Sequence, residues 1–354
     1  MIKATSQKIK LLIVDDSIVI RTFLKDLFSG QPDFDVIETA SNPYKARDIM
    51  RLNWPDVITL DVEMPRMNGI EFLKKIMHSK PTPVVMISTL TKDRAAITLE
   101  ALEIGAVDYF PKPEISTWEV LGHVKEEVLR KVRNAATSNI KKRGLMQESQ
   151  TIIDTEADVS RTLNKVVLIG SSTGGVQALT RIFVRLPKST PGIAVVQHMP
   201  PTFIESLAEQ LAKKTTLTVK VASDNEPLIP GKIVFAPGNY HLEIVKRSGM
   251  FYTQIVEGKP EGYHIPAVNR LFSSAARIGG PDILGIILTG MGDDGAMGIQ
   301  QMRQNNCRTI GQDKESSIVY GMPRKAFELG AIEEQVSLSN ISQKIVDFGE
   351  GRLK

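Results

Sequence analysis

A serine inside a glycine-rich turn is the clearest chemical feature of this sequence. Residues 169–175 read Ile-Gly-Ser-Ser-Thr-Gly-Gly and contain the pattern G-x-S-x-G centred on Ser172. An apolar run precedes the pattern and a helical repeat follows it. The turn would therefore present the Ser172 hydroxyl beside the amides of a helix N-terminus, which stabilise an oxyanion. A glycine turn that only packs or binds phosphate has the same spacing, so the motif alone leaves both interpretations open.

Serine is a poor nucleophile without a base, and histidine is the usual base. Three of the five histidines lie in the second half of the chain. His198 directly follows the apolar run Ile193–Gln197, which places it at the carboxyl end of a strand and at the same end of the sheet as Ser172. His241 and His264 lie near turns with glycine or proline, where each could be structural or face a substrate. The pattern favours His198 as the base.

A carboxylate that orients the histidine would complete such a site. The strand predicted at Ile283–Leu288 runs into a loop with two candidates, Asp293 and Asp294. This loop also has the spacing G-x-G-x-x-G from Gly290 to Gly295, which is typical of dinucleotide-binding turns. Both aspartates would face the pyrophosphate of a dinucleotide with like charge. We therefore favour an orienting carboxylate over a nucleotide site.

The first half of the chain carries a different set of groups at predicted strand ends. Asp15 and Asp16 follow the first strand, Asp61 the third, Ser88 the fourth and Lys112 the fifth. Clustered carboxylates need a cation, and oxygen ligands favour Mg²⁺ or Ca²⁺. Beside such an ion a carboxylate can accept a phosphoryl group, which a lysine and a hydroxyl then bind. Any one acid alone could be a helix cap or a solvated loop residue, but the combination favours a phosphorylation site.

Strands and helices alternate in the first half, and this order positions those groups. Apolar runs predict strands at Lys10–Val14, Asp35–Ala40, Asp56–Leu60, Pro83–Ile87 and Ala106–Tyr109. Amphipathic stretches lie between them; the first predicted helix has Ser17 as its N-cap, and the last runs from Trp118 to Arg133. Successive β-α units predict an α/β domain, doubly wound around a parallel sheet, in which ligands gather at the carboxyl ends of the strands.

The second half predicts another, mainly parallel α/β domain. Its predicted strands are Lys165–Ile169, Ile193–Gln197, Leu217–Ala222, Lys232–Phe235 and Ile283–Leu288, and its predicted helices are Val176–Leu186, Phe203–Lys214, Ala267–Arg277 and Ala296–Asn305. A β-hairpin is expected from His241–Val245 and Phe251–Val256. This order indicates a Rossmann-like domain of three α/β/α layers. Residues 134–162 are polar and lack aromatic residues, so we expect a linker there.

Length and composition agree with two soluble domains. The 354 residues exceed one ordinary core, and 42% hydrophobic and 24% charged residues are typical of globular proteins. No apolar run approaches the roughly 20 residues that span a bilayer, and the N-terminus has no signal-peptide core. With a single cysteine, Cys307, these features predict a cytoplasmic protein without membrane insertion. A net charge of +4 without an aromatic-rich basic cluster argues against nucleic acid as a partner.

The motifs of the first half resemble the receiver domain of bacterial response regulators. The likeness covers residues 8–133 and rests on Val14-Asp-Asp-Ser17, Leu60-Asp-Val-Glu-Met-Pro65, Asn68-Gly69 and Phe110-Pro-Lys-Pro113. It implies a flavodoxin-like fold with Asp61 as the phosphoacceptor and a cis peptide bond before Pro113. The other implied roles are Mg²⁺ binding, together with Asp61, by Asp15 and Asp16, and a switch formed by Ser88, Tyr109 and Lys112.

A second resemblance covers residues 163–350. Gly170-Ser-Ser-Thr-Gly-Gly175, Gln197-His-Met-Pro200, Ala236-Pro-Gly238 and Leu288–Ala296 are similar to the catalytic domain of the chemotaxis protein-glutamate methylesterases. This resemblance implies Ser172 as nucleophile, His198 as base and Asp294 as orienting carboxylate. Thr173 and the backbone near Met291 would complete the oxyanion hole. Asp293 stands where the family often has asparagine and Asn269 where it usually has aspartate, so no role follows for either residue.

Together the two resemblances imply a phosphorylation-controlled serine hydrolase of bacterial chemotaxis. Its substrates would be glutamate methyl esters, and glutamines by deamidation, on methyl-accepting chemotaxis receptors. The phosphodonor would be the chemotaxis histidine kinase, with Mg²⁺ in the receiver domain and no cofactor for the hydrolase. Phosphorylation of Asp61 is expected to rearrange Ser88 and Tyr109 and to uncover the active site. A receiver fused to a DNA-binding domain is the alternative, but the second half predicts no helix-turn-helix and no basic face.

Overall fold

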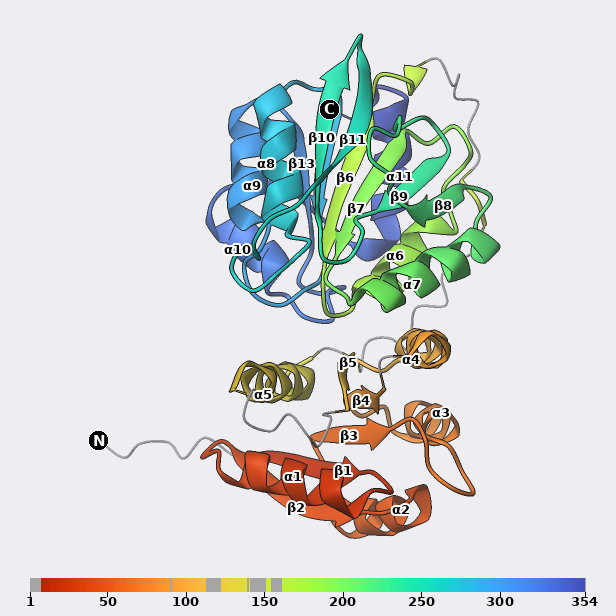
Figure 1. The fold of residues 1–354 in the computed structure, drawn as a ribbon, viewed down its shortest axis with the longest axis vertical. Helices are drawn as coiled ribbons and strands as arrows, with labels where there is room; N and C mark the ends of the chain where they lie inside the picture. Colours follow the sequence, from red (N-terminus) through yellow and green to blue (C-terminus); the bar gives the residue numbers. More distant parts are fainter. Residues whose placement is uncertain are drawn as a thin grey trace, which may run out of the picture. The chain divides into compact units, whose positions relative to one another are not determined.

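The computed structural model describes residues 8–89, 91–112, 122–138, 140, 151–153 and 161–353. The chain divides into two compact units, Met1–Leu145 and Met146–Lys354 (Figure 1). The division falls within the segment 134–162, which the sequence predicts to be a linker. Each unit is built on its own parallel sheet.

The first unit is a parallel sheet of five strands in the order β2-β1-β3-β4-β5. Its strands are β1 (Ile9–Val14), β2 (Phe34–Ala40), β3 (Val57–Asp61), β4 (Val84–Ser88) and β5 (Asp108–Pro111). Its helices are α1 (Ile18–Ser29), α2 (Pro43–Leu52), α3 (Gly69–Ser79), α4 (Lys92–Ile104) and α5 (Gly122–Ala136). Helices cover both faces of the sheet (Figure 1), and β3 and β4 are buried along their whole length, which explains their continuous apolar runs.

The predicted strands of this unit are confirmed, with ends shifted by one or two residues. The predicted N-cap of α1 is also confirmed, since the Ser17 hydroxyl accepts from the amide of Ile20. Helix α5 continues to Ala136, past the predicted end at Arg133, so the first residues assigned to the linker are helical. The predicted start of this helix at Trp118 and the expected cis bond before Pro113 lie outside the described residues.

The second unit has a parallel sheet of seven strands in the order β14-β13-β12-β6-β7-β9-β8, and a separate antiparallel hairpin of β10 and β11. The strands are β6 (Val166–Ser171), β7 (Gly192–Gln197), β8 (Thr218–Val221), β9 (Lys232–Phe235), β10 (His241–Arg247), β11 (Met250–Val256), β12 (Ile283–Ile287), β13 (Arg308–Gln312) and β14 (Glu334–Val336). The helices are α6 (Gly175–Phe183), α7 (Pro201–Lys214), α8 (Val268–Ile278), α9 (Ala296–Gln304), α10 (Met322–Glu328) and α11 (Leu338–Gly349). The predicted strands, helices and hairpin are confirmed, whereas β13, β14, α10 and α11 were not predicted.

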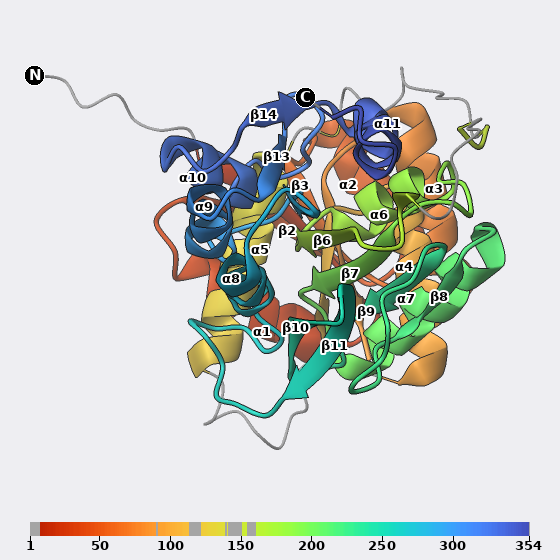
Figure 2. The same ribbon diagram turned by 90° about the horizontal axis from the view of Figure 1, so that it is seen from above.

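Helices and the hairpin sandwich this second sheet, as a view along a different axis also shows (Figure 2). Helices α8 and α9 pack on each other and the hairpin contacts α8, while α6 contacts α7 and α11. One core cluster joins alternate residues of β6 and β7, such as Leu168 and Val196, to Leu271 of α8 and Ile299 of α9. The central strands β6, β7 and β12 are buried throughout, so the loops at their carboxyl ends are attached to the buried centre of the unit.

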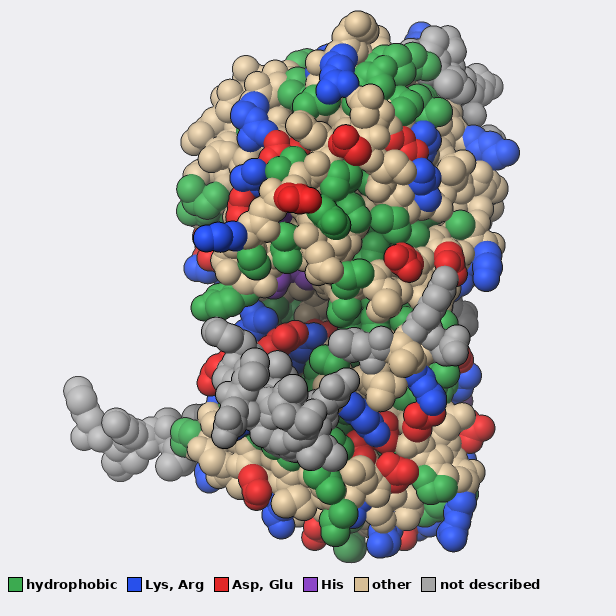
Figure 3. Space-filling model, in the orientation of Figure 1, with side chains coloured by type: hydrophobic (Ala, Val, Ile, Leu, Met, Phe, Trp, Pro, Cys, Tyr) green, Lys and Arg blue, Asp and Glu red, His purple; other side chains and the backbone are tan. Residues whose placement is uncertain are grey.

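The distribution of charged side chains and the length of apolar helices are two further properties of the described residues. Lys and Arg side chains are interspersed with Asp and Glu over the described residues of the face drawn in Figure 3. Within the described ranges, no helix has both the length and the apolar character needed to cross a bilayer.

Candidate functional site

The carboxyl ends of β6 and β7 bring Ser172 and His198 together. Ser171, the last residue of β6, is paired with Gln197, the last residue of β7. Ser172 and His198 therefore follow directly after paired residues on neighbouring strands. The His198 amide donates to the Ser171 carbonyl at 3.1 Å, and the Ser172 amide donates to the carbonyl of Thr289, just past β12, at 3.1 Å. Three central strands thus hold the backbone of the site.

The turn after Ser172 requires its two glycines. Gly174 has φ +82°, in the left-handed region, and a Cβ there would lie 2.8 Å from the Ile318 side chain. A Cβ on Gly175 would lie 2.0 Å from Oε1 of Gln197. The Gly175 amide closes the turn by donating to the Ser172 carbonyl at 2.8 Å. The glycines therefore let the chain turn sharply from β6 into α6, with Ser172 two residues before the N-cap of that helix.

Gln197 holds this turn in place, although the sequence did not single it out. Its side-chain Oε1 accepts from the Ser171 hydroxyl at 2.7 Å. Its Nε2 donates to the carbonyls of Ser172 at 3.0 Å and His198 at 3.2 Å. A buried amide that bonds both segments fixes their separation. A polar residue at the buried end of an apolar strand, directly before the histidine, is the signal that could have identified it.

His198 and Asp294 form a buried pair. Nε2 of His198 lies 2.8 Å from Oδ2 of Asp294, and the side chains are 7% and 8% exposed. The carboxylate also accepts from two amides at the N-terminus of α8, those of Val268 at 2.7 Å and Asn269 at 2.9 Å. Burial raises the pKa of Asp294, but the His198 contact and the two amides outweigh it and lower the pKa below the usual value. The carboxylate is thus held in its charged form beside the imidazole.

The second ring nitrogen of His198 remains available. Within the described part of the chain, Nδ1 is buried without a hydrogen-bond partner. The Ser172 hydroxyl therefore makes no hydrogen bond to Nδ1 in this structure, although strand pairing brings the backbones of the two residues together. In enzymes without substrate, bonds between a nucleophile and its base are often long and tighten only when substrate binds. Because Nε2 is committed to Asp294, Nδ1 is the atom on this ring that can take up a proton.

The other histidines and acids of this region have distinct surroundings. The His264 ring stacks on His198, with centroids 3.7 Å apart and planes 8° apart. His241 is structural, since Nε2 lies 3.0 Å from the Lys259 carbonyl and Nδ1 accepts from the amide of Ala267 at 3.2 Å. Of the predicted acids, Asp294 reaches the histidine, whereas Asp293 is exposed.

Asn269 and the predicted oxyanion-hole residues lie around the same loop. The Asn269 side chain accepts from the amide of Gly298 at 2.9 Å, so it ties α8 to α9 rather than acting as an acid. The Thr173 carbonyl accepts from the Thr289 hydroxyl at 3.0 Å. Met291 is half-buried, in the loop between β12 and α9. Thr173 and Met291 therefore lie in the loops that follow the neighbouring strands β6 and β12.

The acids of the first unit also converge. Ligand atoms of Asp15, Asp16 and Asp61 all lie within 4.8 Å of one another. Nζ of Lys112 lies 2.6 Å from Oδ2 of Asp61 and 3.5 Å from Oδ2 of Asp15. Burial, followed by the charge of Asp15, raises the pKa of Asp61 to about 7 despite the lysine. The arrangement concentrates negative charge that a single lysine does not balance.

This cluster fits a divalent cation. Oδ2 of Asp15 is buried and, among the described residues, makes no hydrogen bond, since the lysine lies beyond close bonding distance. A buried carboxylate oxygen without a hydrogen bond is costly, and a bound cation would compensate it better than an ammonium 3.5 Å away. The donor set consists of oxygens only, which suits Mg²⁺. Asp15, Asp16 and Asp61 would hold such an ion.

Two of the predicted switch residues, Ser88 and Tyr109, contact the neighbouring helices of the first unit. The Ser88 hydroxyl lies 2.8 Å from that of Thr98 on α4. Tyr109 is buried, and Nζ of Lys131 on α5 lies 5.0 Å from its ring centre and donates to its carbonyl at 2.7 Å. Ser88 is therefore linked to α4 and Tyr109 to α5, contacts that the sequence did not reveal.

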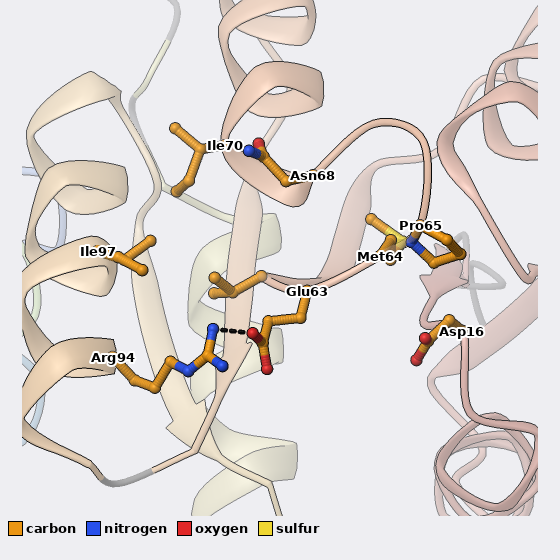
Figure 4. Close-up of a pocket in the computed structure, with 9 residues that line it drawn as sticks. Asp16, Glu63, Met64, Pro65, Asn68, Ile70, Arg94 and Ile97 are labelled. Carbon is orange, nitrogen blue, oxygen red and sulfur yellow. Dashed lines mark ion pairs between the residues drawn. The ribbon is translucent and has the colours of Figure 1, made fainter.

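A pocket of about 580 Å³ borders the acid cluster on the side of Asp16. Its walls come from the segment 62–70 and from α4 (Figure 4). Figure 4 shows Arg94 directed toward Glu63, with which it forms an ion pair, and Asp16 on the opposite side. The pocket leaves the surroundings of the acids accessible from outside the unit.

Comparisons with known proteins find a match for each of the two units. Residues 11–121 match the family model of the response regulator receiver domain, and residues 167–345 match that of CheB methylesterase. A protein-glutamate methylesterase/protein-glutamine glutaminase of Caulobacter vibrioides is 44% identical over 98% of this chain and 99% of its own length. A relative with the same name from Sulfurimonas denitrificans is 43% identical over 96% and 98%.

A solved structure supports the fold of the second unit. The CheB methylesterase catalytic domain of Thermotoga maritima is 38% identical to this chain, with a TM-score of 0.50, and covers 52% of this chain and 97% of that domain. Since the family model, the relatives and the geometry agree, this chain belongs to the CheB methylesterase family, with a response regulator receiver domain ahead of the methylesterase domain.

Proposed function

We propose that this chain is a serine hydrolase that removes methyl groups from glutamate esters of chemoreceptors and deamidates their glutamines, under control of receiver phosphorylation. The curated relatives carry the names of both activities. The observation that supports the catalytic roles is the buried His198–Asp294 pair. Nδ1 of His198 has no hydrogen-bond partner among the described residues, and His198 and Ser172 directly follow paired residues of β7 and β6.

The reaction would proceed through an acyl-enzyme. Nδ1 of His198 takes the Ser172 proton as Oγ attacks the ester carbonyl, and Asp294 stabilises the resulting imidazolium. The proton then passes to the leaving methoxide, which departs as methanol. Water attacks the acyl-enzyme while His198 takes its proton, and the glutamate carboxylate leaves as Ser172 regains a proton. With glutamine as substrate, ammonia departs in place of methanol.

Charge on the carbonyl oxygen would be stabilised by backbone donors. Thr173 stands near the N-terminal end of α6, and Met291 in the loop after β12. Both loops are fixed to central strands, so their amides need no rearrangement when the oxyanion forms. We assign Thr173 and the backbone near Met291 to the oxyanion hole.

Control would begin at Asp61. Bound Mg²⁺ supplies positive charge that favours phosphoryl transfer to a carboxylate. Lys112 then pairs with the new phosphoryl oxygens, and the Ser88 hydroxyl donates to one of them. Movement of Ser88 would change its hydrogen bond to Thr98 and so affect α4. We infer a histidine kinase of the chemotaxis system as phosphodonor and the cytoplasm as the location, and we propose that the phosphorylated state uncovers the esterase site.

Methanol release from methylated receptor membranes tests this function. Wild type should release methanol faster after addition of acetyl phosphate with Mg²⁺, and Ser172→Ala should release none while its Tm stays unchanged. Asp61→Asn should keep the basal rate and lose the activation, whereas Asp48→Asn, at an exposed position of α2, should respond like wild type. Full activity of Ser172→Ala would refute the hydrolase, and equal activation of Asp61→Asn would refute the control.

A further inference from the structure

A single segment encloses the His198–Asp294 pair on two sides. His264 stacks on the face of the His198 ring with centroids 3.7 Å apart. Four and five residues later, the amides of Val268 and Asn269 at the start of α8 bind both oxygens of the Asp294 carboxylate. The same short stretch of chain therefore contacts the base and its carboxylate.

The segment that carries His264 is itself anchored. Backbone bonds in both directions join Glu261 and His264, at 3.0 and 3.1 Å. The Glu261 carboxylate lies 3.1 Å from the Arg270 guanidinium on α8, and Arg270 lies 2.7 Å from Glu243 on β10. Tyr263 is 84% exposed, so the chain turns that side chain outward and the next one inward. The position of His264 is thus determined by the fold around it.

Stacking restricts a motion that hydrogen bonding leaves free. The bond from Nε2 to Asp294 fixes one edge of the His198 ring, but the ring can still pivot about that contact. A parallel ring at 3.7 Å blocks rotation toward its side, because van der Waals contact is already made. When His198 takes up a proton, its positive charge also lies against an aromatic face, which is a favourable arrangement.

We propose that His264 is a positioning residue for the esterase reaction. Its ring holds the His198 imidazole in the plane in which Nε2 contacts Asp294 and Nδ1 can accept the Ser172 proton. The inference rests on the proposed roles of Ser172 and His198. It requires an aromatic ring at position 264, and no proton transfer to or from that ring.

Two substitutions of similar bulk separate the ring from the volume it fills. In the full-length phosphorylated chain, His264→Phe keeps an aromatic face and should retain kcat within about threefold of wild type. His264→Leu fills the space without a ring, and kcat should fall by about 10- to 100-fold at unchanged KM, since misplacing a catalytic group has effects of this size. His78→Leu, at an exposed histidine in the last turn of α3, serves as the control for loss of a histidine.

A second readout keeps the test independent of the ester substrate. The rate at which a fluorophosphonate labels Ser172 reports its nucleophilicity, and it should follow the order wild type, Phe, Leu. Should His264→Leu lower Tm, His264→Asn provides another variant without an aromatic ring, and it should label as slowly as Leu. Wild-type rates in the Leu variant, or equal losses in Phe and Leu, would overturn the proposal. Failure of wild type to release methanol, with the labelling order intact, would refute the ester substrate and leave the role of His264 supported.

Discussion

Replacing Asp294 by asparagine is the sharpest test of the esterase site. The carboxylate accepts three bonds at 2.7 to 2.9 Å, from His198 and from the amides of Val268 and Asn269. An amide of the same shape has one oxygen and one NH₂ group, and NH₂ cannot accept a hydrogen bond. In the better orientation the oxygen faces His198 and Val268, and the Asn269 amide loses its acceptor.

The expected loss follows from burial. Both side chains of the pair are at most 8% exposed, so little solvent replaces the missing charge. Removing one partner of a buried ion pair destabilises the charge that remains by about 3–5 kcal/mol. If that difference appears when His198 becomes protonated, kcat falls by about 10² to 10⁴, since about 1.4 kcal/mol corresponds to a factor of ten. KM should change little, because the carboxylate contacts the base rather than the substrate.

Methanol release by the phosphorylated full-length chain measures this effect. The control is the same substitution one position earlier, Asp293→Asn, because Asp293 is exposed and should tolerate the change with a rate near wild type. Labelling of Ser172 by a fluorophosphonate should slow in parallel for Asp294→Asn. A wild-type kcat in Asp294→Asn, or an equal loss in Asp293→Asn, would show that the buried pair does not orient the base.

Three further changes test other parts of the structure. Gly174→Ala places a Cβ on a residue with left-handed backbone angles, 2.8 Å from the Ile318 side chain. Urea unfolding should show a free energy of unfolding lower by about 1–3 kcal/mol, and fluorophosphonate labelling of Ser172 should slow. Gln197→Leu removes the side-chain bonds by which Gln197 joins the ends of β6 and β7, here called the Gln197 clamp, and it should lower both Tm and kcat. Little change in Tm and kcat would show that these bonds are dispensable. Glu226 has a lowered pKa, because bonds from the Ser223 amide and two lysines outweigh the effect of burial. Its stabilisation is therefore present above the unfolded pKa of about 4.3 and disappears as the pH falls through the folded pKa; Glu226→Gln should cost about 1–2 kcal/mol at pH 7 in urea unfolding, and progressively less in more acidic buffer.

The sequence could predict which residues end the central strands, but not all of their neighbours. Asp294, His198 and the acids around Asp61 follow apolar runs, and parallel sheets collect such ends along one edge. The stacking of His264 and the clamp of Gln197 depend on which loops fold back over that edge. Residue 264 is 66 positions from 198, and no periodic pattern encodes so distant a contact.

The elements missed in the fold have a similar cause. Strand β13 contains Gly311 and polar residues at Arg308 and Gln312, so it lacks a continuous apolar run, and β14 has only three residues. The buried Gln312 is satisfied from outside the strand, since its Oε1 accepts from the Thr289 amide at 2.8 Å. Pairing partners therefore stabilise these strands, and local sequence preference does not reveal them.

The attachment of Ser172 and His198 to paired residues of β6 and β7 limits how activity can be regulated. Moving one residue relative to the other would break hydrogen bonds in the middle of a buried sheet and the Gln197 clamp with them. A signal from another part of the chain would need far less free energy to admit or exclude substrate. The esterase is therefore expected to stay chemically competent while switched off, so a reagent small enough to pass any cover should label Ser172 equally well in both phosphorylation states.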